Sequence, residues 1–130
     1  MQRNYLKVRR HTRILVSGLA DVWKEGSDMT GHFFNVSDMV ICLINNISKG
    51  GMGAFSTVPL QAGDRVTIRR MNMSAVVSED VITGTIVWVA GKDRSYNMGI
   101  CFNEELSKGT NPELYKVLFE ERYGVRPANS

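Results

Sequence analysis

The residues of this chain with the clearest chemistry lie in two short groups. The first is Arg9-Arg10-His11-Thr12-Arg13, which places two guanidinium groups four positions apart. The second is Asn46-Ile47-Ser48-Lys49-Gly50-Gly51, which supplies an amide and a hydroxyl followed by two glycines. Guanidinium groups form paired hydrogen bonds with phosphate, amides and hydroxyls bond to a purine edge, and glycine lets a ligand approach the backbone. Taken as one site, the two groups predict a pocket for a phosphorylated purine.

Each group also has an ordinary structural interpretation. By themselves, Arg9, Arg10 and Arg13 are typical of a solvated basic arm. By itself, the segment 46–51 is typical of a polar β-turn, in which Asn and Ser bond their own backbone and glycine supplies a positive φ. The order of the two groups, together with the segments that follow them, favours the binding site.

The sequence does not predict an enzyme. His11 and His32 are the only histidines, no Ser–His or Cys–His pairing can be argued, and no carboxylates are spaced as metal ligands. Cys42 and Cys101 lie in apolar, strand-like runs without a Cys-x-x-Cys spacing, so we expect buried structural thiols. We therefore predict no catalytic residue, no metal site and no cofactor.

The charge of the chain is unevenly distributed. The net charge is +3, but five of the 16 Lys and Arg residues lie within the first 20 residues, which contain no acid. The rest of the chain therefore has 11 basic and 13 acidic residues. A general nucleic-acid surface would spread basic residues along one face with interleaved aromatic residues. The local concentration favours an anion site or a basic arm instead, and disfavours nucleic acid as a partner.

Length and hydropathy predict one soluble domain. A chain of 130 residues is large enough for an ordinary core and too small for two. The longest apolar run, Met39 to Ile44, is far shorter than the roughly 20 residues that span a bilayer. The basic N-terminal segment is not followed by the apolar stretch of a signal peptide. We expect a cytoplasmic protein without membrane insertion.

Short strands separated by turns dominate the predicted secondary structure. Alternation is clearest in 95–103, where Tyr96, Met98, Ile100 and Phe102 share one side. Further strand-like runs cover 14–23, 39–44, 65–71 and 81–89, and in the last of these Ile82, Ile86 and Trp88 share a side. Gly91-Lys92-Asp93 is expected to join the last two strands in a hairpin, and 28–38 to form an extended loop or a longer hairpin end. The pattern predicts a mostly β fold, a small antiparallel β-barrel.

Only the C-terminal part has a helical pattern. Asn111 is expected to cap the helix, Pro112 suits the first turn, and Gly124 ends it. Leu114, Val117 and Leu118 would share a buried face. Packing of this helix against the barrel is favoured, and the alternative is an exposed Phe119 or Tyr123 that serves a partner. The expected organisation is a single domain with an N-terminal arm (1–13), a barrel (14–110) and a C-terminal helix (111–124).

The order Arg-x-x-x-Arg then Asn-x-Ser-x-x-Gly resembles the signature of the PilZ family, bacterial receptor domains for cyclic di-GMP. The resemblance extends from Lys7 to Phe102. It includes, after the two motifs, Met52-Gly53-Ala54, Leu60-x-x-Gly63-Asp64-x-Val66, Gly84-Thr85-Ile86-Val87-Trp88 and Asn97-Met98-Gly99-Ile100-x-Phe102. The later segments look like the framework strands of the family.

The resemblance implies roles for six residues. Arg9 and Arg13 would contact phosphates and guanines with help from Arg10, Asn46 and Ser48 would bind a guanine, and Gly51 would allow close approach. The chain departs from the family pattern in two ways. The stretch between Arg13 and Asn46 is longer than usual, and Asn46 replaces the commoner Asp, so a charge that strengthens guanine binding is missing.

Three functions remain open at this point. The leading hypothesis is a single-domain PilZ-like receptor that binds cyclic di-GMP and signals through ligand-dependent contacts with an unidentified effector protein. The alternative is a PilZ-type adaptor that works without ligand. A β-barrel that binds nucleic acid through its basic arm is the least favoured, and it predicts affinity that falls steeply with salt.

Overall fold

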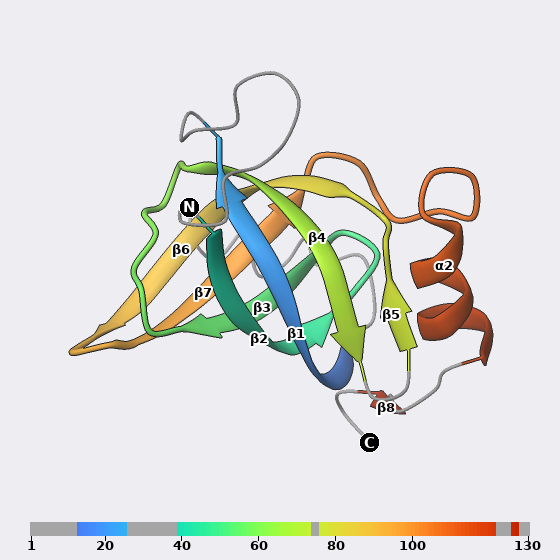
Figure 1. Ribbon diagram of the computed structural model, residues 1–130, viewed down its shortest axis with the longest axis horizontal. Helices are drawn as coiled ribbons and strands as arrows, with labels where there is room; N and C mark the ends of the chain where they lie inside the picture. Colours follow the sequence, from blue (N-terminus) through green and yellow to red (C-terminus); the bar gives the residue numbers. More distant parts are fainter. Residues whose placement is uncertain (1–12, 26–38, 74–75, 122–125, 128–130) are drawn as a thin grey trace.

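A computed structural model of the chain describes residues 13–25, 39–73, 76–121 and 126–127. Its strands are β1 (Ile14–Lys24), β2 (Met39–Ile47), β3 (Gly51–Ser56), β4 (Arg65–Met73), β5 (Val76–Ser78), β6 (Ile82–Lys92), β7 (Ser95–Phe102) and β8 (Arg126–Pro127). The order in the sheet is β5-β4-β6-β7-β3-β2-β1-β8, and β1 also pairs with β4. The strands from β4 to β1 therefore close into an antiparallel barrel, with β5 and β8 attached beside it (Figure 1). The predicted β-barrel is confirmed, whereas the arm residues 1–12 and the segment 28–38 lie outside the described residues.

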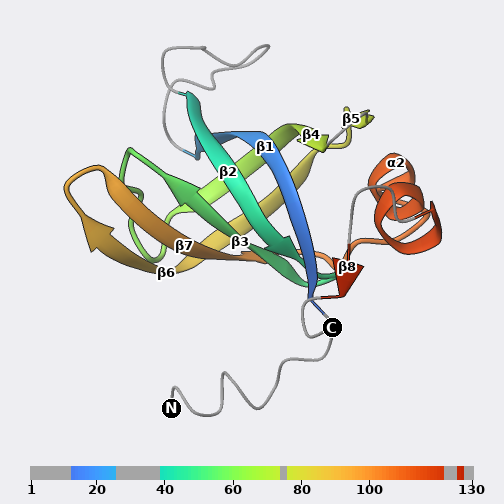
Figure 2. The same cartoon turned by 90° about the horizontal axis from the view of Figure 1, so that it is seen from below.

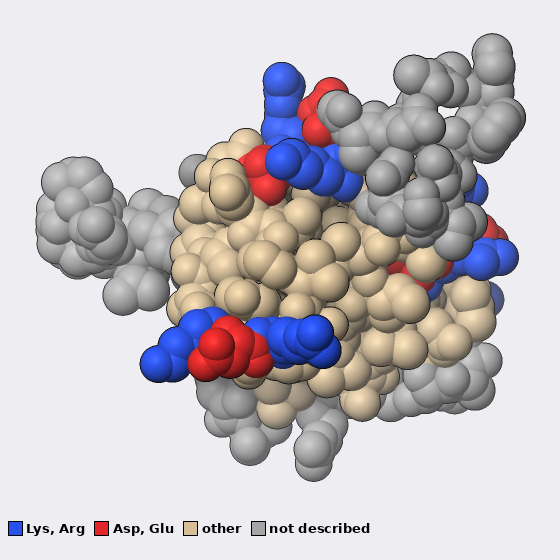
Figure 3. All heavy atoms as spheres, turned by 60° about the vertical axis from the view of Figure 1, so that its left-hand side comes forward, with Lys and Arg blue, Asp and Glu red and all other residues tan. Residues whose placement is uncertain are grey.

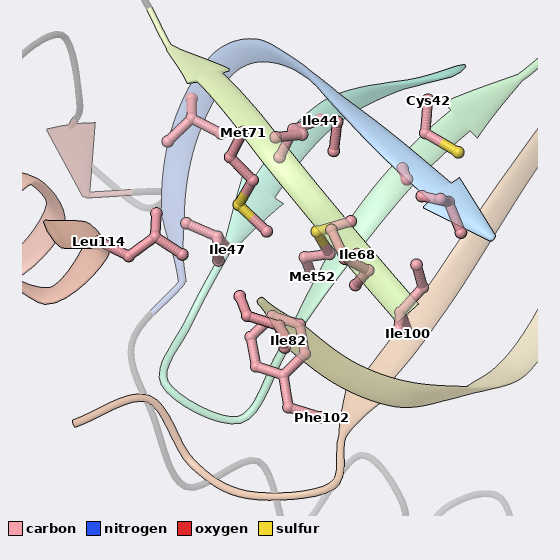
Figure 4. Close-up of a cluster of buried hydrophobic side chains, with 14 of the residues drawn as sticks. Cys42, Ile44, Ile47, Met52, Ile68, Met71, Ile82, Ile100, Phe102 and Leu114 are labelled. Carbon is pink, nitrogen blue, oxygen red and sulfur yellow. The ribbon is translucent and has the colours of Figure 1, made fainter. Parts of the chain in front are cut away.

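The barrel interior is filled by alternate side chains of its strands. Figure 4 shows several of them converging between the strands and the C-terminal helix, with Ile47, Met52 and Ile68 near the middle. All three are almost completely shielded from solvent. Burying an aliphatic side chain of this size contributes about 1.5–3 kcal/mol. The buried side chains thus stabilise the barrel. The outer face of the barrel remains available for contacts with other molecules.

Three strands of the structure are not predicted by the sequence: β3, β5 and the two-residue β8. β3 lies directly after the Asn-x-Ser-x-x-Gly motif and has the sequence Gly-Met-Gly-Ala-Phe-Ser. Gly is depleted in strands and Ala mildly so, which weakens the strand signal in this segment. β5 has only three residues. The alternation predicted for β7 is confirmed, because Met98, Ile100 and Phe102 are buried.

The prediction that Trp88 shares a side with Ile86 is wrong. The pairing of β6 with β7 runs from Ile86–Ile100 to Trp88–Gly99, so two steps on β6 oppose one step on β7. This is a β-bulge, and an extra residue reverses the side to which the following side chain points. Ile86 is buried, whereas Trp88 is 41% exposed on the outer face.

The β6–β7 hairpin is confirmed, but its turn lies further along the chain than predicted. Gly91 pairs with Tyr96 and Lys92 with Ser95, which leaves Asp93 and Arg94 as the two-residue loop. Both loop residues have positive φ, 56° and 67°. This combination is the type I′ turn, whose twist matches that of the flanking strands.

The two cysteines differ in environment. Cys42 is fully buried, and desolvation, with a smaller contribution from Asp21, raises the pKa of its thiol to about 12. Cys101 is exposed, so the prediction that it is buried is wrong. It lies between the inward-facing Ile100 and Phe102, and successive strand residues point to opposite faces.

The C-terminal helical segment consists of α2 (Pro112–Tyr115) and the π-helical η2 (Lys116–Glu121). Figures 1 and 2 both place it beside the barrel near β5. Leu114, Val117 and Leu118 are buried, and Phe119 packs partly buried against the core. Packing against the barrel is therefore confirmed, and the exposed Phe119 of the alternative is not observed. Residues 122–125, which include the predicted end of the helix and Tyr123, lie outside the described part of the chain.

The predicted cap by Asn111 is wrong in its chemistry. Asn111 occupies the N-cap position, but its side chain makes no capping hydrogen bond and accepts one from the Thr110 hydroxyl at 2.8 Å. The amide of Leu114 donates instead to Oδ2 of Asp80 at 3.0 Å. The carboxylate before β6 thus satisfies an amide that a local side chain usually satisfies, and it ties the helix to the barrel.

Candidate ligand-binding site

The structure brings Arg13 and Asn46 into contact. Arg13 immediately precedes β1, and β1 pairs with β2 so that Leu15 lies opposite Asn46. Nη1 of Arg13 donates a hydrogen bond to Oδ1 of Asn46. The last arginine of the first motif and the first residue of the second are therefore neighbours. Arg9 and Arg10 lie outside the described residues.

Ser48 belongs to the turn between β2 and β3. Asn46 and Ser48 lie two positions apart, which would place their side chains on one side of an extended strand, but β2 already ends at Ile47. The amide of Ser48 donates to the Gly51 carbonyl at 2.8 Å, and the Gly50 amide donates to its hydroxyl at 3.3 Å. Ser48 is only 7% exposed. Its hydroxyl organises the turn, as in the β-turn interpretation of this motif.

Gly51 is required by the packing of the barrel. Its φ is not positive, so Gly51 does not supply the positive φ that the β-turn interpretation of this segment expects of a glycine. Gly51 pairs with Cys101 across β3 and β7, and a Cβ atom built on it would lie 2.4 Å from the carbonyl oxygen of Ile100. No side chain fits there without moving the backbone. The glycine thus fixes the end of the turn against β7.

One row of residues crosses five strands on the outer face of the barrel. Leu15 pairs with Asn46, Asn46 with Gly53, Gly53 with Gly99, and Gly99 with Trp88. Directly opposite residues in a sheet share a face. The residues that flank this row within β3 and β7, among them Met52 and Met98, point into the core. The row is therefore outward-facing, and its second residue, Asn46, is the one that Arg13 contacts.

Bulges bring two side chains of this row, Asn46 and Trp88, to the outer face. On β2 the register shifts between Ile44 and Asn46, and on β6 it shifts between Ile86 and Trp88. Strict alternation would turn both Asn46 and Trp88 into the core together with the buried isoleucines. Bulges commonly re-aim side chains next to functional sites. Sequence periodicity alone therefore misplaces Trp88 and does not identify it as a site residue.

Two glycines make room for these side chains on the sheet. A Cβ atom on Gly53 would lie 2.9 Å from Nδ2 of Asn46, and one on Gly99 would lie 2.1 Å from Nε1 of Trp88. The amide and the indole thus lie directly over backbone that has no side chain of its own. The result is a polar group, a glycine-floored strip and a planar aromatic ring in one line. Glycine in a strand marks such close approaches, and the Asn97-x-Gly99 segment was the signal available in the sequence.

The described residues offer neither a metal centre nor a membrane-spanning helix. Within 13–25, 39–73, 76–121 and 126–127, no group of three or more His, Cys, Asp or Glu side chains is arranged to hold a metal ion. No helix in the same ranges is long and apolar enough to cross a bilayer.

Comparison with known families decides what kind of domain this is. The family model described as PilZ domain matches residues 7–120. The chain belongs to the PilZ domain family. The match includes both motifs, the row on the outer face and the helical segment. No curated protein is similar enough in sequence to be matched with the chain.

Solved structures share the fold of this PilZ domain at low sequence identity. The PilZ domain of YcgR from Escherichia coli with cyclic di-GMP has a TM-score of 0.58 and 18% identity, over 88% of this chain and 92% of that one. The PilZ domain of CeSA from a cellulose-synthesizing bacterium has a TM-score of 0.55 and 13% identity, over 85% and 98%. The Bacillus subtilis inhibitor of motility, MotI/DgrA, has a TM-score of 0.57 and 12% identity, over 88% of this chain. This chain spans about half the length of the MotI/DgrA structure, 51%.

Proposed function

We propose that this PilZ domain binds cyclic di-GMP on the outer face of the barrel, between the arginine motif and the row from Asn46 to Trp88. The observation that carries the proposal is the contact between Arg13 and Asn46, which joins the two motifs at one place. The YcgR structure contains cyclic di-GMP in a domain of the same fold, which supports the choice of ligand. The family match covers both motifs and supports the same choice.

Each group in the proposed site suits one part of a cyclic dinucleotide. The guanidinium groups of Arg13, Arg9 and Arg10 pair with phosphate oxygens or with guanine O6 and N7. The amide of Asn46 and the hydroxyl of Ser48 bond to a guanine edge. The exposed indole of Trp88 offers a planar surface on which a guanine stacks, because bases stack readily on aromatic side chains. Trp88 thus adds stacking to a site that the motifs describe only as polar.

We further propose that the domain acts as a cytoplasmic receptor, without catalysis, and reports its ligand to an effector protein. In this proposal the N-terminal arm, residues 1–13, closes over the ligand and so changes the surface that a partner contacts. A ligand shifts such an equilibrium only through its different affinities for the two states. The arginines supply this difference, because their hydrogen bonds to the ligand form only in the closed state.

Two alternatives make different predictions. A ligand-independent adaptor predicts no measurable binding of cyclic di-GMP. A nucleic-acid-binding barrel would bind through the basic arm. On the face seen in Figure 3 the described residues add no continuous basic surface to that arm, because groups of both charges lie around a broad uncharged area. Binding that tolerates any oligonucleotide and falls steeply with salt would favour the nucleic-acid reading instead.

Isothermal titration with cyclic di-GMP, cyclic di-AMP and GMP tests the proposal. We expect saturable binding of cyclic di-GMP with clear preference over the other two. Guanidinium groups pair with the two acceptors O6 and N7 of guanine, whereas adenine has a donor at N6, and GMP lacks the second nucleotide. Arg13→Ala is expected to weaken binding about 10- to 150-fold, since charge-assisted hydrogen bonds contribute roughly 1.5–3 kcal/mol. Arg94→Ala, at the exposed hairpin tip, is the matched control and should bind as the parent does. Failure of the parent protein to bind at high micromolar concentrations would refute the proposal.

A further inference from the structure

The turn that carries Ser48 is bonded to the segment leading into the C-terminal helix. The carbonyl of Lys49 accepts a hydrogen bond from the Leu106 amide at 2.8 Å. The carbonyl of Gly50 accepts one from the Phe102 amide at 2.9 Å. Both acceptors lie within the Asn-x-Ser-x-x-Gly motif. The backbone of this motif therefore cannot move without also moving the chain that follows β7.

The side chain of Lys49 extends this connection to the helix itself. Its Nζ lies 5.4 Å from the ring centroid of Tyr115 and 5.5 Å from that of Phe119. The two rings contact each other, with centroids 5.1 Å apart and planes tilted by 50°. A cation within about 6 Å of an aromatic face is attracted by the ring quadrupole. One ammonium group from the motif thus holds two rings, one from α2 and one from η2.

The helical segment is anchored on its other sides by the barrel. Leu114 and Leu118 are fully buried in the core, and the Leu114 amide is bonded to Asp80. Lys49 lies on the side where the helical segment meets the motif. The proposed ligand contacts use Asn46 and Ser48 and leave Lys49 unassigned. The contact of Lys49 with both rings indicates a different role for this residue.

We infer that Lys49 is a positioning residue that couples the ligand-binding turn to the C-terminal helix. This inference rests on the proposed function. The ligand binds Ser48 only when the turn holds one conformation, and the contact of Lys49 with Tyr115 and Phe119 stabilises that conformation. Coupling between two sites is reciprocal, so ligand binding must strengthen the docking of the helix by the same factor. The docking of the helical segment against the barrel thereby depends on whether the site holds a ligand.

Hydrogen exchange of the full chain, with and without saturating cyclic di-GMP, tests the coupling. In the parent protein the ligand is expected to slow exchange of the amides in 112–121. Lys49→Met keeps an unbranched stem but removes the charge. It should weaken ligand binding about two- to fivefold, the factor of an exposed cation–π contact, and abolish the ligand-induced slowing. Lys49→Arg keeps a cation that stacks on aromatic rings and should restore both.

Two further variants separate coupling from simple damage to the fold. Phe119→Leu removes one of the two rings and keeps an apolar side chain. It should reduce the slowing without abolishing it, because the contact of Lys49 with Tyr115 remains. Combined with Lys49→Met it should add no further loss, because both substitutions break the same contact. Lys92→Met on the exposed hairpin should change neither quantity. A Lys49→Met variant that binds the ligand and still shows the full slowing of 112–121 would overturn the coupling alone. A parent protein that does not bind would overturn the proposed function and the coupling with it.

Discussion

Two turns of the same barrel illustrate the difference between connecting strands and building a site. The turn between β6 and β7 has two residues, Asp93 and Arg94, both exposed and both with positive φ. The turn between β2 and β3 spans 48–50, and in it Ser48 is buried while Lys49 and Gly50 are partly buried. Its Lys49 and Gly50 carbonyls accept hydrogen bonds from Leu106 and Phe102. The first turn depends only on its own strands, whereas the second is also bonded to β7 and to the segment that follows β7.

This difference indicates where substitutions are tolerated. A hairpin tip that contacts nothing else tolerates change as long as its backbone conformation is available to the new residues. A turn whose backbone is bonded to distant segments transmits any change to them. We therefore expect substitutions in 48–51 to alter both stability and ligand binding, and substitutions in 93–94 to alter stability alone.

The largest effect is expected from Gly51→Ala. The new Cβ would lie 2.4 Å from the Ile100 carbonyl oxygen, so β3 and β7 must separate at the end of the turn. We expect a loss of about 2 kcal/mol or more in the free energy of unfolding, and loss of ligand binding. Urea denaturation measures the first and calorimetry the second.

Gly109→Ala is the matched control for this substitution. A Cβ atom on Gly109 would have its nearest neighbour, the Ser107 hydroxyl, at 3.9 Å, so the site has room. Its effect should stay within about 0.5 kcal/mol. Equal stability of the two variants would show that β3 and β7 can separate freely, and the contrast between the turns would then be lost.

Much of the fold could be predicted because the barrel follows the period-2 rule. Met98, Ile100 and Phe102 are buried, as their alternation in a strand requires. Leu114 and Leu118 of the helical segment are also buried, and their spacing of four residues is that of one helix face. The rule fails wherever a bulge inserts one residue. Trp88 is the main example, because no local signal in Val87-Trp88-Val89 marks the shift of register opposite Gly99.

The candidate site could be predicted in composition but only partly in geometry. The residue types of Arg13 and Asn46 identify anion and purine chemistry, and their contact depends on the pairing of β1 with β2, which is long-range. Nothing in the sequence indicates that the Ile100 carbonyl oxygen leaves no room for a side chain at Gly51. It also does not reveal that Lys49 reaches the helix, because the rings it contacts lie more than 60 residues away along the chain. Residue spacing along the sequence does not predict contacts that form only when distant segments pack together.

An intermediate effect is expected from Ser48→Ala. The substitution removes a hydroxyl that bonds the Gly50 amide and that we assign to the guanine edge. A neutral hydrogen bond contributes roughly 0.5–1.5 kcal/mol, so ligand affinity should fall about two- to tenfold. Circular dichroism should show an unchanged barrel, because the strands on both sides retain their pairing.

Ser95→Ala provides the corresponding test in the other turn. Ser95 is exposed and directly follows the Asp93-Arg94 loop, so its substitution should leave ligand affinity unchanged. If Ser48→Ala binds the ligand within twofold of the parent affinity, the Ser48 hydroxyl does not contact the ligand. If Ser95→Ala lowers ligand affinity tenfold, the ligand binds at the hairpin tip. The β6–β7 turn, and not the β2–β3 turn, would then belong to the site.

The smallest expected effect is a gain, from the double substitution Asp93→Asn with Arg94→Gly. Arg94 has a φ of 67°, a conformation in which its Cβ is crowded and that glycine adopts freely. Asn-Gly is the preferred pair for a type I′ turn. The free energy of unfolding should rise by about 0.5–1 kcal/mol, partly offset by the greater freedom of glycine in the unfolded chain, and the melting temperature by a few degrees. Affinity for cyclic di-GMP should stay at the parent value, because this turn is bonded only within its own hairpin. A stabilised variant with altered affinity would mean that the two turns communicate through β7, and that the independence of the hairpin tip does not hold.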